Sequence, residues 1–412
     1  MPKKPQIRKM ILEKQLTDSL QESEIILAMI PCPYFGSTGS SVNERQLLEA
    51  LSRKVSKVIV FSLTPISQMS IGKKNIEKPS NILLISLPLI TRLGVLCQAL
   101  YSPILLLLTL LLDSVYKVEF IYVRMSLLAF TFTMFKRLRD KLIVKIPALF
   151  EDEIKSKTPS KRLICLLVSL FDKVVLKNAA LIASPSTLLI RKIIVKRCIP
   201  RGRIIIVPPG VDLEKINRVK NEIKFMKKEE FIVGFLGLFS SWQGIDILVE
   251  SVAKLKDAGL DKPVKLLLVG DGPERRRIED LCKKLEIDYE ITGFVKHEKA
   301  LEYLSMFDVL VLPSYRISTT ESNIPIKVIE AWALGIPVIT TRHEIYEYMK
   351  LKNWEDVIYC EPDPEDVANK ILMVLRDENL KKRLSEKGLL LANNFYYNNI
   401  ALRLVEAFMK SL

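Results

Sequence analysis

The 412-residue sequence is poor in the residues that build metal sites and disulfide frameworks. It has two histidines, and its six cysteines are scattered without a CxxC pair. This spacing argues against a structural zinc site or a disulfide-built fold and favours reduced thiols. With 15 glycines, 21 prolines and 49% hydrophobic residues, a collagen-like or disordered chain is also excluded. The length predicts two domains of roughly 200 residues each.

Negative charge is scarce in the first half of the chain. Residues 1–210 contain 32 Lys and Arg against 14 Asp and Glu, whereas residues 211–412 contain 30 against 33. The two halves therefore face different partners. Aromatic and basic residues do not interleave as in a nucleic-acid-binding module, so no nucleic-acid partner is predicted. Residues 1–24 are charged and lack the apolar run of a signal peptide, and we interpret them as a polar extension.

Apolar runs of three to six residues alternate with longer helical stretches. The runs are continuous, which is typical of parallel strands that helices cover on both faces. Strands are predicted over residues 25–30, 57–61, 82–87, 120–123, 142–146, 180–184 and 204–207, and again over 231–236, 264–269, 289–291, 309–312, 337–340 and 357–359. Helices are predicted near 42–53, 93–115, 126–137, 160–177 and 186–196, and near 245–257, 274–285, 298–305, 326–334 and 365–376.

The pattern breaks at residues 208–212 and resumes after a charged linker that runs to Glu230. The sequence therefore predicts an α/β protein of two facing Rossmann-like domains, each with a doubly wound parallel sheet. The predicted domains are residues 25–212 and 213–390, and a C-terminal crossover helix in 391–412 packs back on the first domain.

One stretch, residues 93–112, contains no charged residue. As a helix it would be about 30 Å long, which is enough to cross a bilayer. Gln98 and Pro103 interrupt it, and it lies between two predicted strands. A buried helix, a helix that rests on a membrane and a spanning helix remain open at this point.

The residues after the predicted strand 309–312 form a polar loop that leads into a helix near Pro325. Proline suits the first helical position, and Ser322 or Asn323 can cap the helix. The backbone N–H groups at such a helix start attract phosphate. The segment is therefore a candidate phosphate site.

Two charged residues lie in the first turns of this helix, three positions apart. Lys327 and Glu330 project from the same face. A cation beside phosphate oxygens and a carboxylate one turn deeper would suit a diphosphate that is joined to a ribose diol. The plainer interpretation is a solvated ion pair on a surface helix.

The segment EAWALGIPVI, which begins at Glu330, resembles the signature of family 4 of the retaining GT-B glycosyltransferases (glycosyl transferases group 1). That signature has a glutamate, seven intervening residues, a second glutamate and a Gly-x-Pro-Val-Ile turn. The resemblance implies that Glu330 holds the ribose hydroxyls of a nucleotide sugar and that Lys327 helps to bind the diphosphate. The first glutamate would fall at Ser322, and Glu321 and Asn323 are the other candidates for contact with the donor sugar.

Other segments are similar to the same family. Residues 206–212 (IVPPGVD) resemble its interdomain motif, 269–274 (VGDGPE) its turn beside the donor, and 293–295 (GFV) its base-contacting loop. Residues 237–244 (GLFSSWQG) align with its diphosphate loop, in which Leu238 and Gln243 replace the usual Arg and Lys.

In the first half, residues 33–42 (PYFGSTGSSV) resemble the family's Gly-rich loop, although these residues alone also fit an ordinary tight turn. Residues 121–124 and 146–153 resemble segments that line the acceptor cleft. The resemblance implies catalytic roles for Lys327 and Glu330. It implies a donor site formed by Gly36, Gly39, Gly237, Gln243, Gly270, Phe294, Val295, Glu321, Ser322, Asn323, Ile324, Lys327 and Glu330.

The implied reaction is sugar transfer with retention, in which the leaving diphosphate takes the proton of the acceptor. Such a reaction needs no histidine base, and we expect no metal and no cofactor besides the nucleotide-sugar substrate. A GT-B epimerase or phosphorylase is disfavoured, because the first half lacks histidine and the Glu330 motif is present. The alternative from another class is a catalytically degenerate nucleotide-sugar binder or assembly partner, motivated by Leu238, Gln243 and Ser322.

Basic segments at 136–141, 155–162 and 191–197 share the first half with the apolar run 93–112. Near an anionic leaflet each cation contributes about 1 kcal/mol of binding. We therefore expect a cytoplasmic enzyme that is peripheral on the inner face of the cell membrane. Its expected acceptor is a lipid-linked saccharide, a glycolipid or another glycan precursor. A soluble basic domain is the plainer interpretation.

Overall fold

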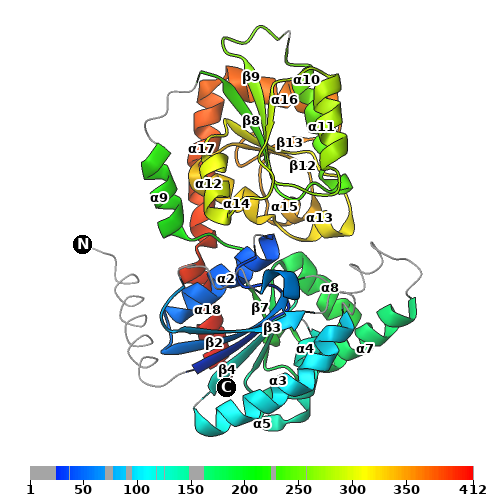
Figure 1. Cartoon of the computed structure of the whole chain (residues 1–412), viewed down its shortest axis with the longest axis vertical. Helices are drawn as coiled ribbons and strands as arrows, with labels where there is room; N and C mark the ends of the chain where they lie inside the picture. The colour runs from blue at the N-terminus through cyan, green and yellow to red at the C-terminus, as the bar shows by residue number, and fades with distance from the viewer. Residues whose placement is uncertain are drawn as a thin grey trace. The chain divides into compact units, whose positions relative to one another are not determined.

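The computed structural model describes residues 25–36, 38–69, 78–89, 95–116, 118–124, 126–147, 162–223, 229–256 and 258–411. The chain divides into two compact units (Figure 1). The N-terminal unit contains Met1–Val207 and Tyr397–Leu412, and the C-terminal unit is Pro208–Tyr396. The predicted extension 1–24 and nearly all of the basic segment 155–162 lie outside the described residues.

The N-terminal unit is built on a seven-stranded parallel sheet in the order β3-β2-β1-β4-β5-β6-β7. Its strands are β1 Ile25–Ile30, β2 Lys57–Pro65, β3 Ile82–Leu89, β4 Val118–Arg124, β5 Leu142–Lys145, β6 Leu181–Ser184 and β7 Ile204–Ile206. The strand order reverses between β1 and β4, so the sheet is doubly wound with its switch point there.

Helices cover both faces of this sheet, and alternate residues of β1 belong to different cores. Ile26 and Ala28 pack with α2 Gly39–Ser52 and with the C-terminal helix α18 Tyr397–Met409. Leu27 and Met29 pack with helices on the opposite face. Those helices are α3 Val95–Val115, α4 Ser126–Ala129, α5 Lys136–Arg139, α7 Arg162–Asn178 and α8 Thr187–Arg197.

The C-terminal unit has a six-stranded parallel sheet in the order β10-β9-β8-β11-β12-β13, and its switch point lies between β8 and β11. Its strands are β8 Phe231–Leu236, β9 Val264–Val269, β10 Tyr289–Ile291, β11 Val309–Leu312, β12 Val338–Thr341 and β13 Ile358–Cys360. Its helices are α9 Leu213–Ile223, α10 Ile245–Ala253, α11 Arg275–Lys284, α12 His297–Ser305, α13 Ser318–Ser322, α14 Ile326–Leu334, α15 Glu344–Tyr348, α16 Pro364–Arg376 and α17 Glu378–Ala392.

Three local predictions differ from the structure. The helix predicted over 126–137 is wrong, because α4, a 3-10 turn η4 Thr131–Met134 and α5 replace it. The Thr131 hydroxyl donates to the backbone oxygen of Ser102 at 3.0 Å, which ties this segment to α3 and interrupts the helix. The charged linker before Glu230 contains α9, whose Ile216 and Val219 join the core. Helices α13, α15 and α17 were not predicted.

A carboxylate on α2 holds together the carboxyl ends of β4 and β5. Glu44 is completely buried, and its oxygens lie 2.8 Å from Lys145 Nζ and 3.5 Å from Arg124 Nε. The Tyr122 hydroxyl donates to the same carboxylate at 2.6 Å. Burial alone would raise the pKa of Glu44, but the charges of Lys145 and Arg124 hold it below its ordinary value.

We expect Glu44→Gln to destabilise the N-terminal unit by about 3–5 kcal/mol, because it leaves Lys145 buried without its carboxylate. All three tryptophans, at 242, 332 and 354, lie in the C-terminal unit, so tryptophan fluorescence would not report on the N-terminal unit. The loss should therefore be measured by hydrogen exchange of amides in β4 and β5. As a control, Asp140→Asn on the surface should change protection by no more than about 0.5 kcal/mol. Equal effects of the two variants would contradict this account.

The same cluster predicts an acid-dependent loss of stability. Because the pKa of Glu44 is lowered in the folded state, its contribution is present above the ordinary value of 4.5 and is lost as the pH falls below it. Amide exchange at decreasing pH should show this loss in the wild type. Glu44→Gln should lack this component, and an identical acid profile in both proteins would contradict the prediction.

Candidate functional site

The candidate donor site lies at the switch point of the C-terminal sheet. The loop after β8 and the loop after β11 touch here, because a Cβ on Gly244 would lie 2.1 Å from the backbone oxygen of Pro313. The Tyr315 N–H also donates to the backbone oxygen of Trp242 at 2.9 Å. Doubly wound sheets bind ligands at this edge, beyond the carboxyl ends of the strands.

A third loop, after β9, packs against the loop after β8 without side chains between them. Gly237 and Gly270 have φ values of +144° and +139°, and a Cβ on Gly270 would lie 1.9 Å from the Gly237 oxygen. The Phe239 N–H donates to the Asp271 oxygen at 2.8 Å. The close approach therefore requires glycine at position 270.

The loop that follows β10 joins this group through its backbone. Gly293 pairs with Gly270 in an isolated antiparallel bridge. Phe294, one residue on, has a side chain that is 65% exposed, whereas Val295 packs partly against the core. The structure thus places Gly237, Gly270, Phe294 and Val295 around one backbone junction.

Lys327 reaches the same junction from the first turn of α14. Its Nζ lies 4.3 Å from the centre of the Phe235 ring and donates to Gln243 Oε1 at 3.1 Å. A Cβ on Gly237 would lie 2.9 Å from this nitrogen. Burial lowers the pKa of Lys327 to about 7. The lysine is therefore held by an amide and an aromatic ring.

Glu330 lies one turn deeper on α14 and is 3% exposed, which is incompatible with the interpretation of a solvated surface pair. Its Oε1 lies 2.6 Å from His297 Nε2, at the first residue of α12. His297 Nδ1 is buried, and the described residues offer it no hydrogen-bond partner. Sequence reasoning missed this contact. The available signal was that His297, one of two histidines, lies two residues beyond the loop 293–295.

Glu321 points toward α15. Its Oε2 accepts a hydrogen bond from the Glu344 N–H, and its Oε1 lies 3.4 Å from His343 Nδ1. The other ring nitrogen of His343 lies 2.8 Å from the Ser314 hydroxyl. Burial lowers the pKa of His343, although Glu321 opposes this effect. In this arrangement Glu321 holds the first turn of α15.

The remaining residues of this loop differ in accessibility. Ser322 is buried and Ile324 belongs to the core, whereas Asn323 is partly buried at the end of α13. Pro325 is the N-cap of α14 and not its first residue, and no described side chain caps the helix. The predicted caps Ser322 and Asn323 are therefore wrong, and no side chain of the described residues makes a capping hydrogen bond at the start of α14.

The predicted Gly-rich loop lies at the switch point of the N-terminal unit. Gly36 packs tightly, since a Cβ there would lie 2.5 Å from Ser41 Oγ. Gly39 is the first residue of α2, and the capping hydroxyl of Thr38 accepts from the Ser41 N–H. The Arg124 guanidinium donates to Ser40 Oγ at 3.3 Å, which connects the loop to the Glu44 cluster.

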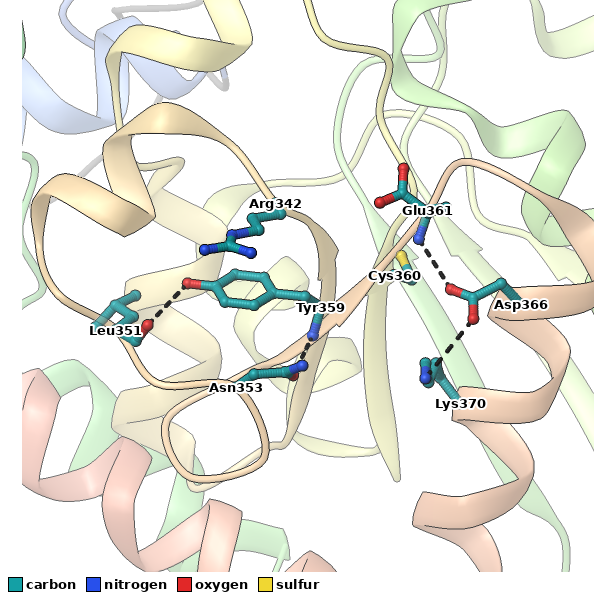
Figure 2. A pocket seen from close by; sticks show the side chains of 8 residues that line it. All are labelled: Arg342, Leu351, Asn353, Tyr359, Cys360, Glu361, Asp366 and Lys370. Atoms are coloured by element: carbon teal, nitrogen blue, oxygen red, sulfur yellow. Dashed lines mark hydrogen bonds and ion pairs between the residues drawn. The ribbon is translucent and has the colours of Figure 1, made fainter.

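A pocket of about 360 Å³ lies beside β13 and contains none of the predicted donor residues (Figure 2). Its polar groups are engaged with one another. The Tyr359 hydroxyl donates to the Leu351 oxygen at 3.2 Å, and the Glu361 N–H donates to Asp366 Oδ2 at 2.9 Å. Lys370 Nζ lies 3.7 Å from Asp366. These contacts engage polar groups of the pocket among the described residues, and the pocket carries no argument for a ligand.

Comparison with known proteins gives matches to glycosyltransferases. The family model of glycosyl transferases group 1 matches residues 217–390. The lipopolysaccharide core biosynthesis glycosyltransferase LpsE of Rhizobium meliloti is 29% identical over 161 residues, which cover 38% of this chain and 43% of LpsE. The matches to the first curated relatives span about half of those relatives' length or less.

Solved structures match over nearly the whole chain. Sucrose-phosphate synthase from Thermosynechococcus elongatus has a TM-score of 0.73 and 20% identity, with 94% of this chain and 99% of that chain covered. HepE from Anabaena, in complex with UDP-glucose, has a TM-score of 0.65 and 13% identity, with coverage of 95% and 100%. At these identities the likeness shows the fold, which is GT-B with a C-terminal helix that returns to the N-terminal unit.

We expect Gly270→Ala to destabilise the C-terminal unit by about 2–4 kcal/mol, because the added Cβ would clash with the Gly237 oxygen. Gly259→Ala is a matched control, since Gly259 also has a positive φ, of +62°, but has nothing within 4 Å of its Cβ position. The control should lose only about 1 kcal/mol. Urea unfolding followed by tryptophan fluorescence would measure both, and equal losses would exclude the clash.

Proposed function

We propose that this protein transfers a sugar from a nucleotide-diphosphate sugar to an acceptor with retention of configuration, because residues 217–390 match the family model of glycosyl transferases group 1. One observation carries the proposal. A single short helix, α14, brings a lysine to the glycine junction of three loops and places a buried carboxylate one turn deeper.

The diphosphate binds at the start of α14. The helix has no side-chain cap among the described residues, so its backbone N–H groups and positive dipole end favour an anion. Lys327 supplies the cation, Gly237 leaves room for its amine beside the loop after β8, and Gly270 lets the loop after β9 pack against that loop. Gln243 positions the lysine by accepting a hydrogen bond from Lys327 Nζ. The family usually has Arg and Lys where this chain has Leu238 and Gln243. Lys327 and the start of α14 supply the positive charge in their place.

The ribose diol binds to Glu330. His297 holds one carboxylate oxygen, which leaves the other oxygen to accept from the ribose hydroxyls. His297 is therefore a positioning residue that acts through Glu330. In the N-terminal unit, we assign a donor-binding role to Gly36 and Gly39 from the resemblance of their loop to the Gly-rich loop of the family. Phe294 and Val295 contact the base.

The donor sugar meets Asn323, Ser322 or the backbone near Ile324, because Glu321 is committed to α15. The family signature has a first glutamate here, but Ser322 stands in its place and Glu321 is engaged with α15. The reaction rate therefore depends on stabilising the leaving diphosphate and on positioning the reactants. The diphosphate itself takes the acceptor proton. We propose that Lys327 stabilises the charge that develops on the leaving group, with no metal and no further cofactor.

The proposed acceptor is a lipid-linked saccharide, a glycolipid or another glycan precursor, bound by the N-terminal unit. The likeness to a lipopolysaccharide core glycosyltransferase and the basic composition of the first half support this choice. The enzyme would then work in the cytoplasm, at the inner face of the cell membrane.

A second candidate is a catalytically degenerate nucleotide-sugar binder or assembly partner. The observation that favours it is the substitution of the diphosphate loop, in which Leu238 is 47% exposed where the family usually has Arg. A protein that binds one nucleotide sugar but releases no nucleotide with any glycan acceptor would support this candidate.

We expect one of UDP, GDP or ADP, or its sugar conjugate, to raise the melting temperature. A ligand at 100 times its Kd adds about 2.7 kcal/mol, which is several degrees for a domain of this size. Glu330→Gln should weaken binding about 10- to 100-fold, since it removes a charge-assisted hydrogen bond. Glu250→Gln on the exposed side of α10 is the control and should bind as the wild type does. No shift with any nucleotide would reject the donor site.

Donor affinity should fall as the pH rises above 7. Lys327 must be charged to hold the diphosphate, and its pKa of about 7 in the free protein means that binding then requires proton uptake. Between pH 7.5 and 9, Kd for the nucleotide sugar should rise up to about tenfold per pH unit. In Lys327→Arg the side chain stays charged, so its Kd should be flat over this range. Titration calorimetry would measure both, and parallel profiles would exclude Lys327 as the titrating group.

A further inference from the structure

Helix α3 carries a row of apolar side chains on its outer side. Leu100, Ile104, Leu107, Leu111 and Val115 are between 48 and 72% exposed. Their spacing of three or four residues places them on one side of the helix. A contiguous exposed apolar surface of this kind marks an interaction site.

The row continues onto neighbouring elements of the same layer, which Figure 1 shows on one side of the N-terminal sheet. The turn η4 contacts both α3 and α7. We call the exposed apolar side chains of these elements the apolar face, and they are Leu100, Ile104, Leu107, Leu111, Val115, Met134, Phe135, Leu170 and Val174.

Cations lie along this face. Residues 135–141 and 170–177 contain six Lys and Arg against two Asp. Lys136, Lys173 and Lys177 are exposed, and Arg137 is 67% exposed even though it pairs with Asp113. An apolar surface bordered by cations is complementary to an anionic bilayer, whose headgroups bind cations and whose acyl chains accept apolar side chains.

The opposite side of α3 is locked into the unit. Leu105 and Leu106 belong to the core beneath the sheet. Ser102 Oγ lies 2.8 Å from Thr131 Oγ1, and buried Asp113 accepts from Lys141 Nζ at 2.9 Å. Helix α3 is long and apolar enough to cross a membrane, but crossing would break these contacts. The contacts therefore favour a helix that lies along a membrane.

We infer that the apolar face docks the N-terminal unit on an anionic lipid bilayer, with α3 parallel to the membrane plane. A symmetric contact between two copies through this face would bring the bordering cations of both copies together, which is unfavourable. The anionic bilayer supplies the opposite charge, and each cation then strengthens binding about fivefold.

This inference deepens the proposed function and rests on it, because a lipid-linked acceptor is held in a membrane. In a parallel sheet the chain leaves each strand at the carboxyl edge. Helix α3 therefore begins at this edge, after β3, and α4 begins there after β4. Leu100 and Ile104 consequently lie near the edge at which the unit binds its acceptor.

Vesicle sedimentation tests the docking. The full-length protein should bind phosphatidylcholine vesicles that contain about 30% phosphatidylglycerol and should bind pure phosphatidylcholine at least tenfold more weakly. Leu107→Asp/Leu111→Asp should lower the partition coefficient more than tenfold. Val195→Asp is the matched control, because Val195 is a highly exposed apolar residue on α8 outside this face. Lys173→Glu/Lys177→Glu should lower binding and flatten its salt dependence.

Tryptophan insertion tests the geometry. Leu107→Trp should be quenched by brominated lipids, whereas Val195→Trp should not. Absence of binding to anionic vesicles at low salt, or equal binding by the double aspartate variant, would overturn the inference. Concentration-dependent dimers without vesicle binding would also overturn it, in favour of a second copy. Resistance to extraction by alkaline carbonate, which removes peripheral proteins, would indicate a spanning helix and would equally overturn it.

The two proposals can fail separately. All variants of the apolar face should keep the nucleotide-induced melting shift of the wild type, because Lys327 and Glu330 are in the other unit and Gly36 and Gly39 are not part of this face. Loss of vesicle binding with an intact shift would overturn only the docking surface. Vesicle binding without any nucleotide-induced melting shift would overturn the proposed glycosyltransferase activity. The apolar face would then remain a membrane-binding surface without a link to a lipid acceptor.

Discussion

The close approach of two glycines in the C-terminal unit is the constraint on which the donor site depends. Gly270 lies against the backbone of Gly237, and this contact fixes the loops after β8 and β9 relative to each other. Lys327 then has a defined place, over Phe235 and beside Gly237. At the other end of the same helix, Gly335 adopts a φ of +77° and packs against α17. The lysine and Glu330 are therefore positioned by backbone geometry at both ends of α14.

Two lysines, the buried Lys145 and the partly buried Lys327, show what is special about this site. Lys145 in the N-terminal unit has a carboxylate at 2.8 Å and the hydrogen-bonded network around it. Lys327 has a neutral amide and an aromatic ring, so burial lowers its pKa to about 7 without a carboxylate to oppose the shift. A cation without an anionic protein partner is costly, and such groups occur where a ligand supplies the missing charge. The contrast supports a diphosphate at Lys327 and a structural role for Lys145.

Sequence periodicity predicted the parallel strands well, because buried strands such as 231–236 and 309–312 are continuous apolar runs between polar loops. It failed where local charge hid an amphipathic helix, as in α9, or where tertiary hydrogen bonds interrupted one, as at Thr131. In the site, the spacing of Lys327 and Glu330 predicted a shared helix face. The contact of His297 with Glu330 joins residues 33 positions apart. The position of His297 just after the loop 293–295 placed it near the site, but a single sequence does not show that its ring contacts Glu330.

Helix α3 shows why hydropathy alone left three interpretations open. An average over the helix records many leucines, but it does not record which side they occupy. In the structure the polar residues Ser102, Thr109 and Asp113 are buried, whereas leucines at 100, 107 and 111 are exposed. This is the reverse of the usual surface helix, whose apolar side faces the core. Because the inward polar groups are satisfied within the unit, the outward leucines are the side that still requires an apolar partner.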